Sequence, residues 1–175
     1  PTIIDKSANI KDAAQKIAWG KWQNAGQVCI APDYLFVHQD VREQLIKELE
    51  DASKKTYGEE ENYGGIINSH HFRRVNGIME DAIANGATIE FGGDKSESEL
   101  RFSPTLLSNV TTDMIILEEE IFGPLVPIMS YTELDEVVEF INHKPKPLAL
   151  YVFSKSKKTI REVQQRTSSG MLTIN

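Results

Sequence analysis

The sequence predicts an α/β fold, an open and largely parallel twisted sheet with helices on both faces. Three observations favour this fold class. Short apolar segments typical of strands alternate along the chain with longer segments whose apolar residues recur at helical spacing. The 175 residues, 40% of them hydrophobic, are enough for one well-buried domain. No internal repeat or low-complexity linker interrupts the alternation, so we expect one domain over residues 1–175.

The first part of the chain predicts a helix, a strand and a second helix. Residues 11–24 form the first expected helix, because apolar residues recur there at helical spacing. Residues 34–38 form a short apolar strand. Asp40 with Glu43 three residues later is a capping-box signature, which predicts that the second helix begins at this point.

The remainder of the chain continues the alternation. A helix is expected over residues 70–85, with Gly86 as its terminator, and a strand over residues 87–91. A Gly-Gly break and a polar loop follow. The later expected elements are strands at 104–110, 125–131, 148–154 and 171–175, and helices at 132–142 and 157–167. In sheets of this kind ligands sit at the carboxyl ends of the strands, so we expect functional residues in loops there.

Charge and composition exclude several classes of protein. The formal net charge is −7 and the Lys and Arg residues are scattered, which argues against a nucleic-acid partner. No apolar run approaches the roughly 20 residues that cross a bilayer, and the N-terminal residues lack a signal-peptide pattern. A single cysteine excludes internal disulfides and multi-cysteine zinc sites. We expect no membrane segment in this chain and a cytoplasmic location.

The histidines and tryptophans have structural interpretations. His70 and His71 are adjacent on an expected helix and point about 100° apart, so they cannot form one metal-binding face. Because zinc needs three or four convergent ligands, no metal is expected. Trp19 and Trp22 lie three residues apart on the first helix, which favours a place in the core or an interface over cofactor contact.

Two loops stand out by composition. The stretch NAGQVCIAPDY holds Cys29, which is either an inert buried residue or a reactive thiol. The stretch EEEIFGPLVP at residues 118–127 is either a solvated acidic turn or a ligand-facing platform. Phe122 favours the platform, because the adjacent Gly-Pro makes a rigid loop and the ring presents a flat apolar face.

The pairing of N-A-G-Q-x-C with E-E-x-F-G-P resembles the aldehyde dehydrogenase superfamily. The stretches PKPLALYVFS, SSGMLTIN and GGIINSHHFRRV look like its class 3 branch, whose members oxidise aromatic and medium- to long-chain aliphatic aldehydes. The resemblance covers essentially the whole chain and implies that residues 1–175 are a catalytic domain. The chain begins at Pro1 without a methionine and ends in a strand-like run, so we expect a fragment that lacks the cofactor-binding domain and the C-terminal arm.

The resemblance also implies roles for individual residues. Cys29 would attack the aldehyde to give a thiohemiacetal, from which hydride passes to NAD or NADP and leaves a thioester for hydrolysis. Glu120 matches the residue that hydrogen-bonds the nicotinamide ribose, and Phe122 the ring that packs on the nicotinamide. Arg74 is a weaker candidate for cofactor contact. The family's general-base glutamate and oxyanion asparagine would precede Pro1, so the chain alone is expected to be inactive.

Other functions remain open from the sequence. The parent protein, expected to be a homodimer acting on a small aldehyde, could instead be an acylating or semialdehyde dehydrogenase relative. PKPLALYVFS argues against that alternative. The chain could also be a non-catalytic α/β scaffold or interaction module.

Overall fold

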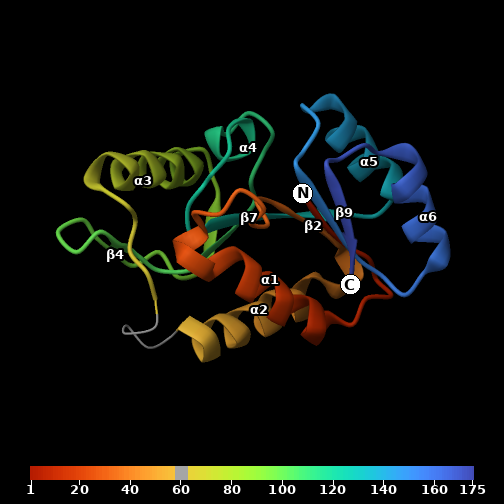
Figure 1. The fold of residues 1–175 in the computed structure, drawn as a ribbon, viewed down its shortest axis with the longest axis horizontal. Helices are drawn as coiled ribbons and strands as arrows, with labels where there is room; N and C mark the ends of the chain where they lie inside the picture. Colours follow the sequence, from red (N-terminus) through yellow and green to blue (C-terminus); the bar gives the residue numbers. More distant parts are fainter. Residues whose placement is uncertain (58–62) are drawn as a thin grey trace.

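The computed structural model of the chain describes residues 1–57 and 63–175 (Figure 1). Seven strands within these ranges form one sheet in the order β3-β6-β7-β2-β1-β8-β9. All neighbouring strands in it pair in parallel except β3 and β6. Their bounds are β1 Thr2–Ile4, β2 Leu35–His38, β3 Thr88–Phe91, β6 Thr105–Ser108, β7 Leu125–Tyr131, β8 Ala149–Phe153 and β9 Met171–Ile174. The predicted α/β fold with a largely parallel sheet is therefore confirmed.

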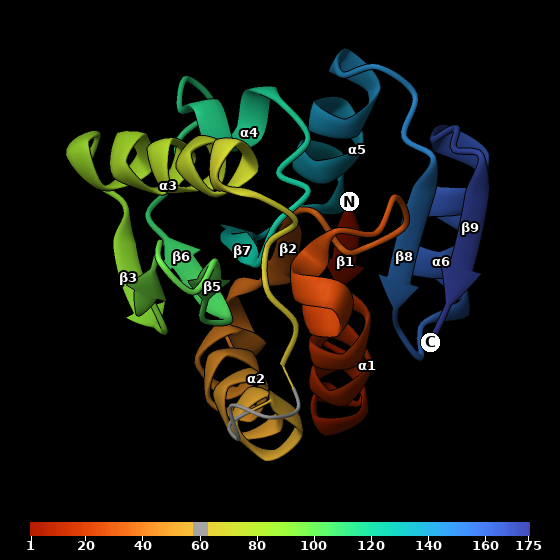
Figure 2. The same ribbon diagram turned by 60° about the vertical axis from the view of Figure 1, so that its left-hand side comes forward.

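Helices cover both faces of the sheet, as predicted. Figure 2 shows α1 and α2 together on one side, and α3, α4 and α5 on the other. The helices are α1 Ile10–Trp22, α2 Arg42–Tyr57, α3 Ser69–Ala84, α4 Ile115–Glu118, α5 Leu134–His143 and α6 Lys157–Arg166. Each helix side has its own apolar cluster.

The central strands are apolar on both sides because each side is buried. In β1, Ile3 packs in the cluster beneath α3 to α6, whereas Ile4 packs in the cluster beneath α1 and α2. Successive residues of a strand point to opposite faces, so two adjacent isoleucines serve two different cores. Trp22, the last residue of α1, is fully buried in the cluster beneath α1 and α2, which confirms its predicted place in the core.

Three features differ from the sequence-based expectation. Strand β1 was not predicted, because three residues are too few to show a period. A one-turn helix, α4, precedes the acidic motif, and a hairpin of β4 (Lys95–Ser96) and β5 (Arg101–Phe102) occupies the expected polar loop. The capping box at Asp40 is wrong: Asp40 lies inside the 3-10 turn Gln39–Val41, where His38 accepts its backbone N–H.

No helix in the described ranges is long and apolar enough to span a membrane.

The apolar core beneath α1 and α2 can be tested at Leu45. Leu45 of α2 is fully buried in the cluster shared by α1, α2 and the sheet. Leu45→Ala is expected to lower the free energy of unfolding by about 2–5 kcal/mol, because it removes apolar contacts and leaves a cavity. The control Gln44→Ala, at an exposed position on the same helix, should change it by less than about 0.5 kcal/mol. Urea unfolding followed by circular dichroism measures both, and equal effects would contradict this assignment of the core.

Candidate active site

The two motif loops lie side by side at one edge of the sheet. The loop with Cys29 leads from α1 into β2, and the loop with Glu120 and Phe122 leads from α4 into β7. Because β2 and β7 are parallel neighbours, both loops meet at the amino ends of these strands. The expectation of a site at the carboxyl ends is therefore wrong for these motifs. That rule describes loops that leave a strand and enter a helix, whereas these loops enter strands.

One glycine allows the two loops to touch. Gly26 has φ +74°, and a Cβ built on it would lie 2.1 Å from the Gly123 carbonyl oxygen. No side chain fits that space. Asn24 and Ala25 before it also have left-handed φ values of 52°, so the chain turns sharply here. The N-A-G-Q-x-C and E-E-x-F-G-P motifs are thus in direct backbone contact.

Helix α3 holds the acidic loop in place. The guanidinium of Arg74 donates to Glu119 Oε1 at 3.1 Å, to the Glu120 carbonyl at 3.2 Å and also to the Ile121 carbonyl. Arg74 Nε donates to His71 Nδ1 at 3.3 Å, so the other ring nitrogen of His71 carries the proton. That nitrogen donates to the Phe122 carbonyl at 2.6 Å. Arg74, predicted only as a weak cofactor contact, orders this loop.

The hydrogen bonds hold an unusual backbone. Phe122 has φ +45°, which costs a residue with a Cβ about 1–3 kcal/mol unless its surroundings fix it. The His71 and Phe122 rings meet edge to face at 6.0 Å between centroids, which adds an apolar contact to the hydrogen bond. His71 therefore holds the backbone and ring of Phe122, a role that its position in the sequence did not indicate. In the described residues, no three His, Cys, Asp or Glu side chains gather as a metal site.

A buried charge lies beneath the same loops. Lys21, at the end of α1, is 1% exposed, and burial lowers its pKa to about 8 despite the opposing effect of the Asp33 and Glu120 carboxylates. Asp33 also accepts the backbone N–H of Ile121 at 3.2 Å, which links the end of the cysteine loop to the acidic loop. The buried Lys21 therefore interacts electrostatically with one carboxylate from each loop, Asp33 and Glu120.

Cys29 is exposed, so its interpretation as an inert core residue is wrong. It sits in a turn closed by the Ala31 N–H, which donates to the Val28 carbonyl at 2.9 Å. Within the described part of the chain, the backbone N–H of Cys29 donates a hydrogen bond to no protein group. Glu120 is exposed as well, and Phe122 is partly exposed. The structure thus presents the thiol, the carboxylate and the ring to solvent from two loops in contact.

An apolar cavity of about 230 Å³ opens beside the turn that carries Cys29. Val28 and Ile30, which flank Cys29, form part of its wall, together with Trp19 of α1 and Tyr151 of β8. Trp19 is 62% exposed. The predicted core or interface role of Trp19 is wrong as regards the core, and the structure gives it a place in this wall. In the sequence, the only indication of this place was that Trp19 lies on the helix that leads to Cys29.

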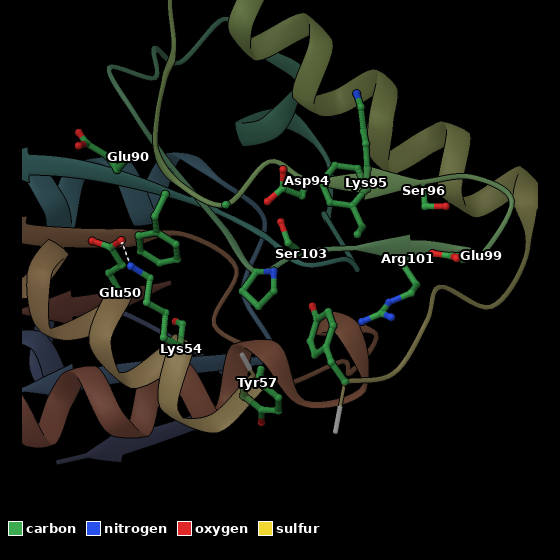
Figure 3. Close-up of a pocket in the computed structure, with 16 residues that line it drawn as sticks. Glu50, Lys54, Tyr57, Glu90, Asp94, Lys95, Ser96, Glu99, Arg101 and Ser103 are labelled. Atoms are coloured by element: carbon green, nitrogen blue, oxygen red, sulfur yellow. Dashed lines mark hydrogen bonds and ion pairs between the residues drawn. The ribbon is translucent and has the colours of Figure 1, made fainter. Parts of the chain in front are cut away.

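A second cavity, of about 560 Å³, lies away from the motifs between α2 and the β4–β5 hairpin (Figure 3). Charged side chains surround it, including Glu50, Lys54, Asp94 and Lys95, and Glu50 and Lys54 neutralise each other in an ion pair at 2.6 Å. Among the described residues that line it there is no cysteine or histidine. This cavity therefore offers no thiol nucleophile or histidine base, although it is larger than the cavity beside the cysteine turn.

Known proteins that resemble this chain are aldehyde dehydrogenases. The model of the "Aldehyde dehydrogenase family" matches residues 1–175. The 4,4'-diaponeurosporen-aldehyde dehydrogenase of Staphylococcus aureus is 43% identical over 100% of this chain and 38% of that protein. The dimeric NADP-preferring aldehyde dehydrogenase of Canis lupus familiaris is 42% identical over the same shares, 100% and 38%. A solved structure, the substrate-bound state of Staphylococcus aureus AldH, has a TM-score of 0.95 and 42% identity, covering 100% of this chain and 38% of that one.

These matches confirm two predictions from the resemblance, the class 3 branch and NAD or NADP as the cofactor. Relatives named as aldehyde dehydrogenase family 3 members A2 and B1 are 40% identical, which agrees with the class 3 branch. Solved structures with this fold include an NAD-dependent aldehyde dehydrogenase from Sinorhizobium meliloti and an NADP-dependent enzyme from E. coli. The chain spans 36% to 38% of the length of the curated relatives described above.

The contact between the motif loops can be tested at Gly26. Gly26→Ala is expected to lower the free energy of unfolding through backbone strain of about 1–2 kcal/mol and a clash of about 1–3 kcal/mol more. Gly86→Ala is the matched control, because Gly86 has φ +103° and nothing within 4 Å of a built Cβ. It should cost the strain alone. Urea unfolding compares the two variants, and an equal loss of stability would show that the loops do not meet as described.

Proposed function

Because this chain belongs to the aldehyde dehydrogenase family, we propose that residues 1–175 form the catalytic domain of an NAD(P)-dependent enzyme. The enzyme oxidises aliphatic or aromatic aldehydes to carboxylic acids. The observation that carries the proposal is the exposed thiol of Cys29 on a loop in backbone contact with the loop of Glu120 and Phe122. The rest of the protein supplies most of the cofactor platform in this proposal.

Cys29 provides the chemistry that an aldehyde requires before oxidation. A carbonyl carbon cannot release hydride, whereas the tetrahedral thiohemiacetal formed by thiolate attack can. The N–H of Cys29, which donates to no group among residues 1–57 and 63–175, lies on the attacking residue itself, so it can donate to the oxyanion of that adduct. Loss of hydride leaves a thioester on Cys29, and its hydrolysis gives the carboxylic acid and restores the thiol.

The acidic loop fits the nicotinamide half of a dinucleotide. NAD(P), when bound, accepts the hydride. Glu120 offers an exposed carboxylate, which accepts hydrogen bonds from a pair of ribose hydroxyls. Phe122 offers a partly exposed ring on a backbone that Arg74 and His71 hold rigid, which suits packing against a flat aromatic group. Both residues project from the loop that touches the loop of Cys29.

The apolar cavity beside Cys29 suits the aldehyde's side chain. Trp19, Ile30 and Tyr151 give it walls that bind a medium-chain aliphatic or aromatic group by burial of apolar surface. A side chain in this cavity leaves its carbonyl near the turn that carries the thiol. The cavity therefore supports an organic aldehyde as substrate.

The alternatives receive less support. An acylating relative would use the same thiol and pass the acyl group to a different acceptor, and no feature of the described residues favours one. A non-catalytic scaffold does not account for the positive φ angles of Ala25 and Phe122, because strained backbone clusters at functional sites. It also does not account for the exposed thiol of Cys29.

Turnover in the whole protein tests the proposed function. Mixed with NAD+ or NADP+ and a medium-chain or aromatic aldehyde, the whole protein should produce reduced cofactor, measured by its absorbance. Cys29→Ser should reduce the rate by about 10³-fold or more, because the hydroxyl is a much poorer nucleophile here. Unchanged turnover in that variant would contradict the proposal. The 175-residue chain alone, which spans 38% of the length of two of its relatives, should form thiol adducts without turnover.

Glu120 should contribute to cofactor placement. Glu120→Gln keeps the size of the side chain and removes the charged acceptor, so kcat/KM should fall by the equivalent of about 1.5–3 kcal/mol. Folding should be almost unchanged, because Glu120 is exposed. Glu118→Gln, at an exposed neighbouring position, is the control and should leave kcat/KM as it was. If both variants behaved alike, the acidic run would be a solvated turn only.

A further inference from the structure

We propose that Tyr151 is a positioning residue for Cys29, because its hydroxyl holds the turn that carries the thiol. The inference deepens the proposed function and rests on it for the identity of Cys29 as the nucleophile. Tyr151 lies in the PKPLALYVFS stretch, to which the family resemblance assigned no functional role.

The hydroxyl of Tyr151 reaches from the sheet to the cysteine loop. Its Oη donates to the Ile30 carbonyl at 2.5 Å. Ile30 follows Cys29 directly, in the turn that the hydrogen bond from Ala31 N–H to the Val28 carbonyl closes. The turn is thus fastened internally by one hydrogen bond and externally by another.

The backbone of Tyr151 is held by strands on both sides. It lies in β8, where it pairs with Thr2 of β1 and with Thr173 of β9 in a parallel register. Its ring is half-buried in the wall of the apolar cavity, between the sheet and the exposed turn. A side chain fixed by a sheet at one end can therefore restrict a loop that is exposed at the other.

The phenol of Tyr151 remains a hydrogen-bond donor at neutral pH. Burial raises the pKa of Tyr151, and the nearby Cys29 raises it further. The phenol therefore stays protonated through neutral pH and remains a hydrogen-bond donor to Ile30.

Positioning matters for one reaction of the thiol and not for another. Attack on a carbonyl builds a tetrahedral adduct whose oxyanion must lie beside the Cys29 N–H, so the orientation of the turn counts. Alkylation by iodoacetamide forms a carbon–sulfur bond, releases iodide and builds no oxyanion. Loss of a positioning contact should slow the first reaction and leave the second nearly unchanged.

The test is made in the whole protein with Tyr151→Phe, which keeps the ring and removes the hydroxyl. Acylation by p-nitrophenyl acetate transfers the acetyl group to the Cys29 sulfur and releases p-nitrophenolate, which is followed by its absorbance. Its rate should fall about 5- to 10-fold, the range for one hydrogen bond. The rate of alkylation by iodoacetamide should change less than about 2-fold. Tyr131→Phe is the control: Tyr131 donates to the Ile4 carbonyl at 3.3 Å, away from the cysteine loop, and both rates should persist.

The outcomes separate this inference from the proposed function. An unchanged acylation rate in Tyr151→Phe overturns it, and so does an equal fall in both rates, which would indicate local unfolding. Absence of acylation in the unchanged protein also overturns it. Failure of the proposed function would instead appear as absence of aldehyde-dependent cofactor reduction in a protein whose Cys29 still acylates.

Discussion

The close approach of Gly26 to the Gly123 carbonyl is the contact on which the candidate site depends. Two segments that lie far apart in the sequence meet there without a side chain between them. Any Cβ at residue 26 would force the loops apart, and it would thereby separate the loop that carries the thiol from the loop that carries Glu120 and Phe122. Glycine is required at this point for both its left-handed φ and its lack of a side chain. The sheet supplies the frame, since β2 and β7 are parallel neighbours and start at the same edge.

The other contacts around the site limit what each loop can do on its own. Arg74 and His71 bind four successive residues of the acidic loop from α3, and Asp33 binds the same loop from the cysteine side. Tyr151 binds the turn that follows the thiol. A site whose exposed groups are restrained by buried or half-buried ones is organised before any ligand arrives, which reduces the entropy lost on binding.

Much of the fold could be predicted because its signals are local and repeated. The helix at α3 shows a clear helical period and the strand at β7 is a short continuous apolar run, and the alternation of such segments along the chain leads to a parallel sheet. What the sequence could not show depends on tertiary contact. Asp40 and Glu43 have the spacing of a capping box, yet His38 caps the turn that contains Asp40. The exposure of Trp19 follows from where β8 and the cysteine loop lie, which no period along α1 reveals.

The candidate site divides in the same way. Cys29, Glu120 and Phe122 carry recognisable motifs, so they could be named from the sequence. The edge of the sheet on which they meet was predicted wrongly, because the usual rule concerns loops that leave strands. Arg74, His71 and Tyr151 act through backbone carbonyls, and a hydrogen bond to a carbonyl leaves no pattern in the sequence of its acceptor.

The most direct measurement of the central claim is a crystal structure of the whole protein with bound NAD+ or NADP+. The account predicts the nicotinamide ring against Phe122, the ribose hydroxyls on the Glu120 carboxylate, and the Cys29 sulfur facing the same ring across the contact of Gly26 with Gly123. A protein that turns over aldehyde while its cofactor lies away from Phe122 and Glu120, or while the two loops stand apart, would contradict it.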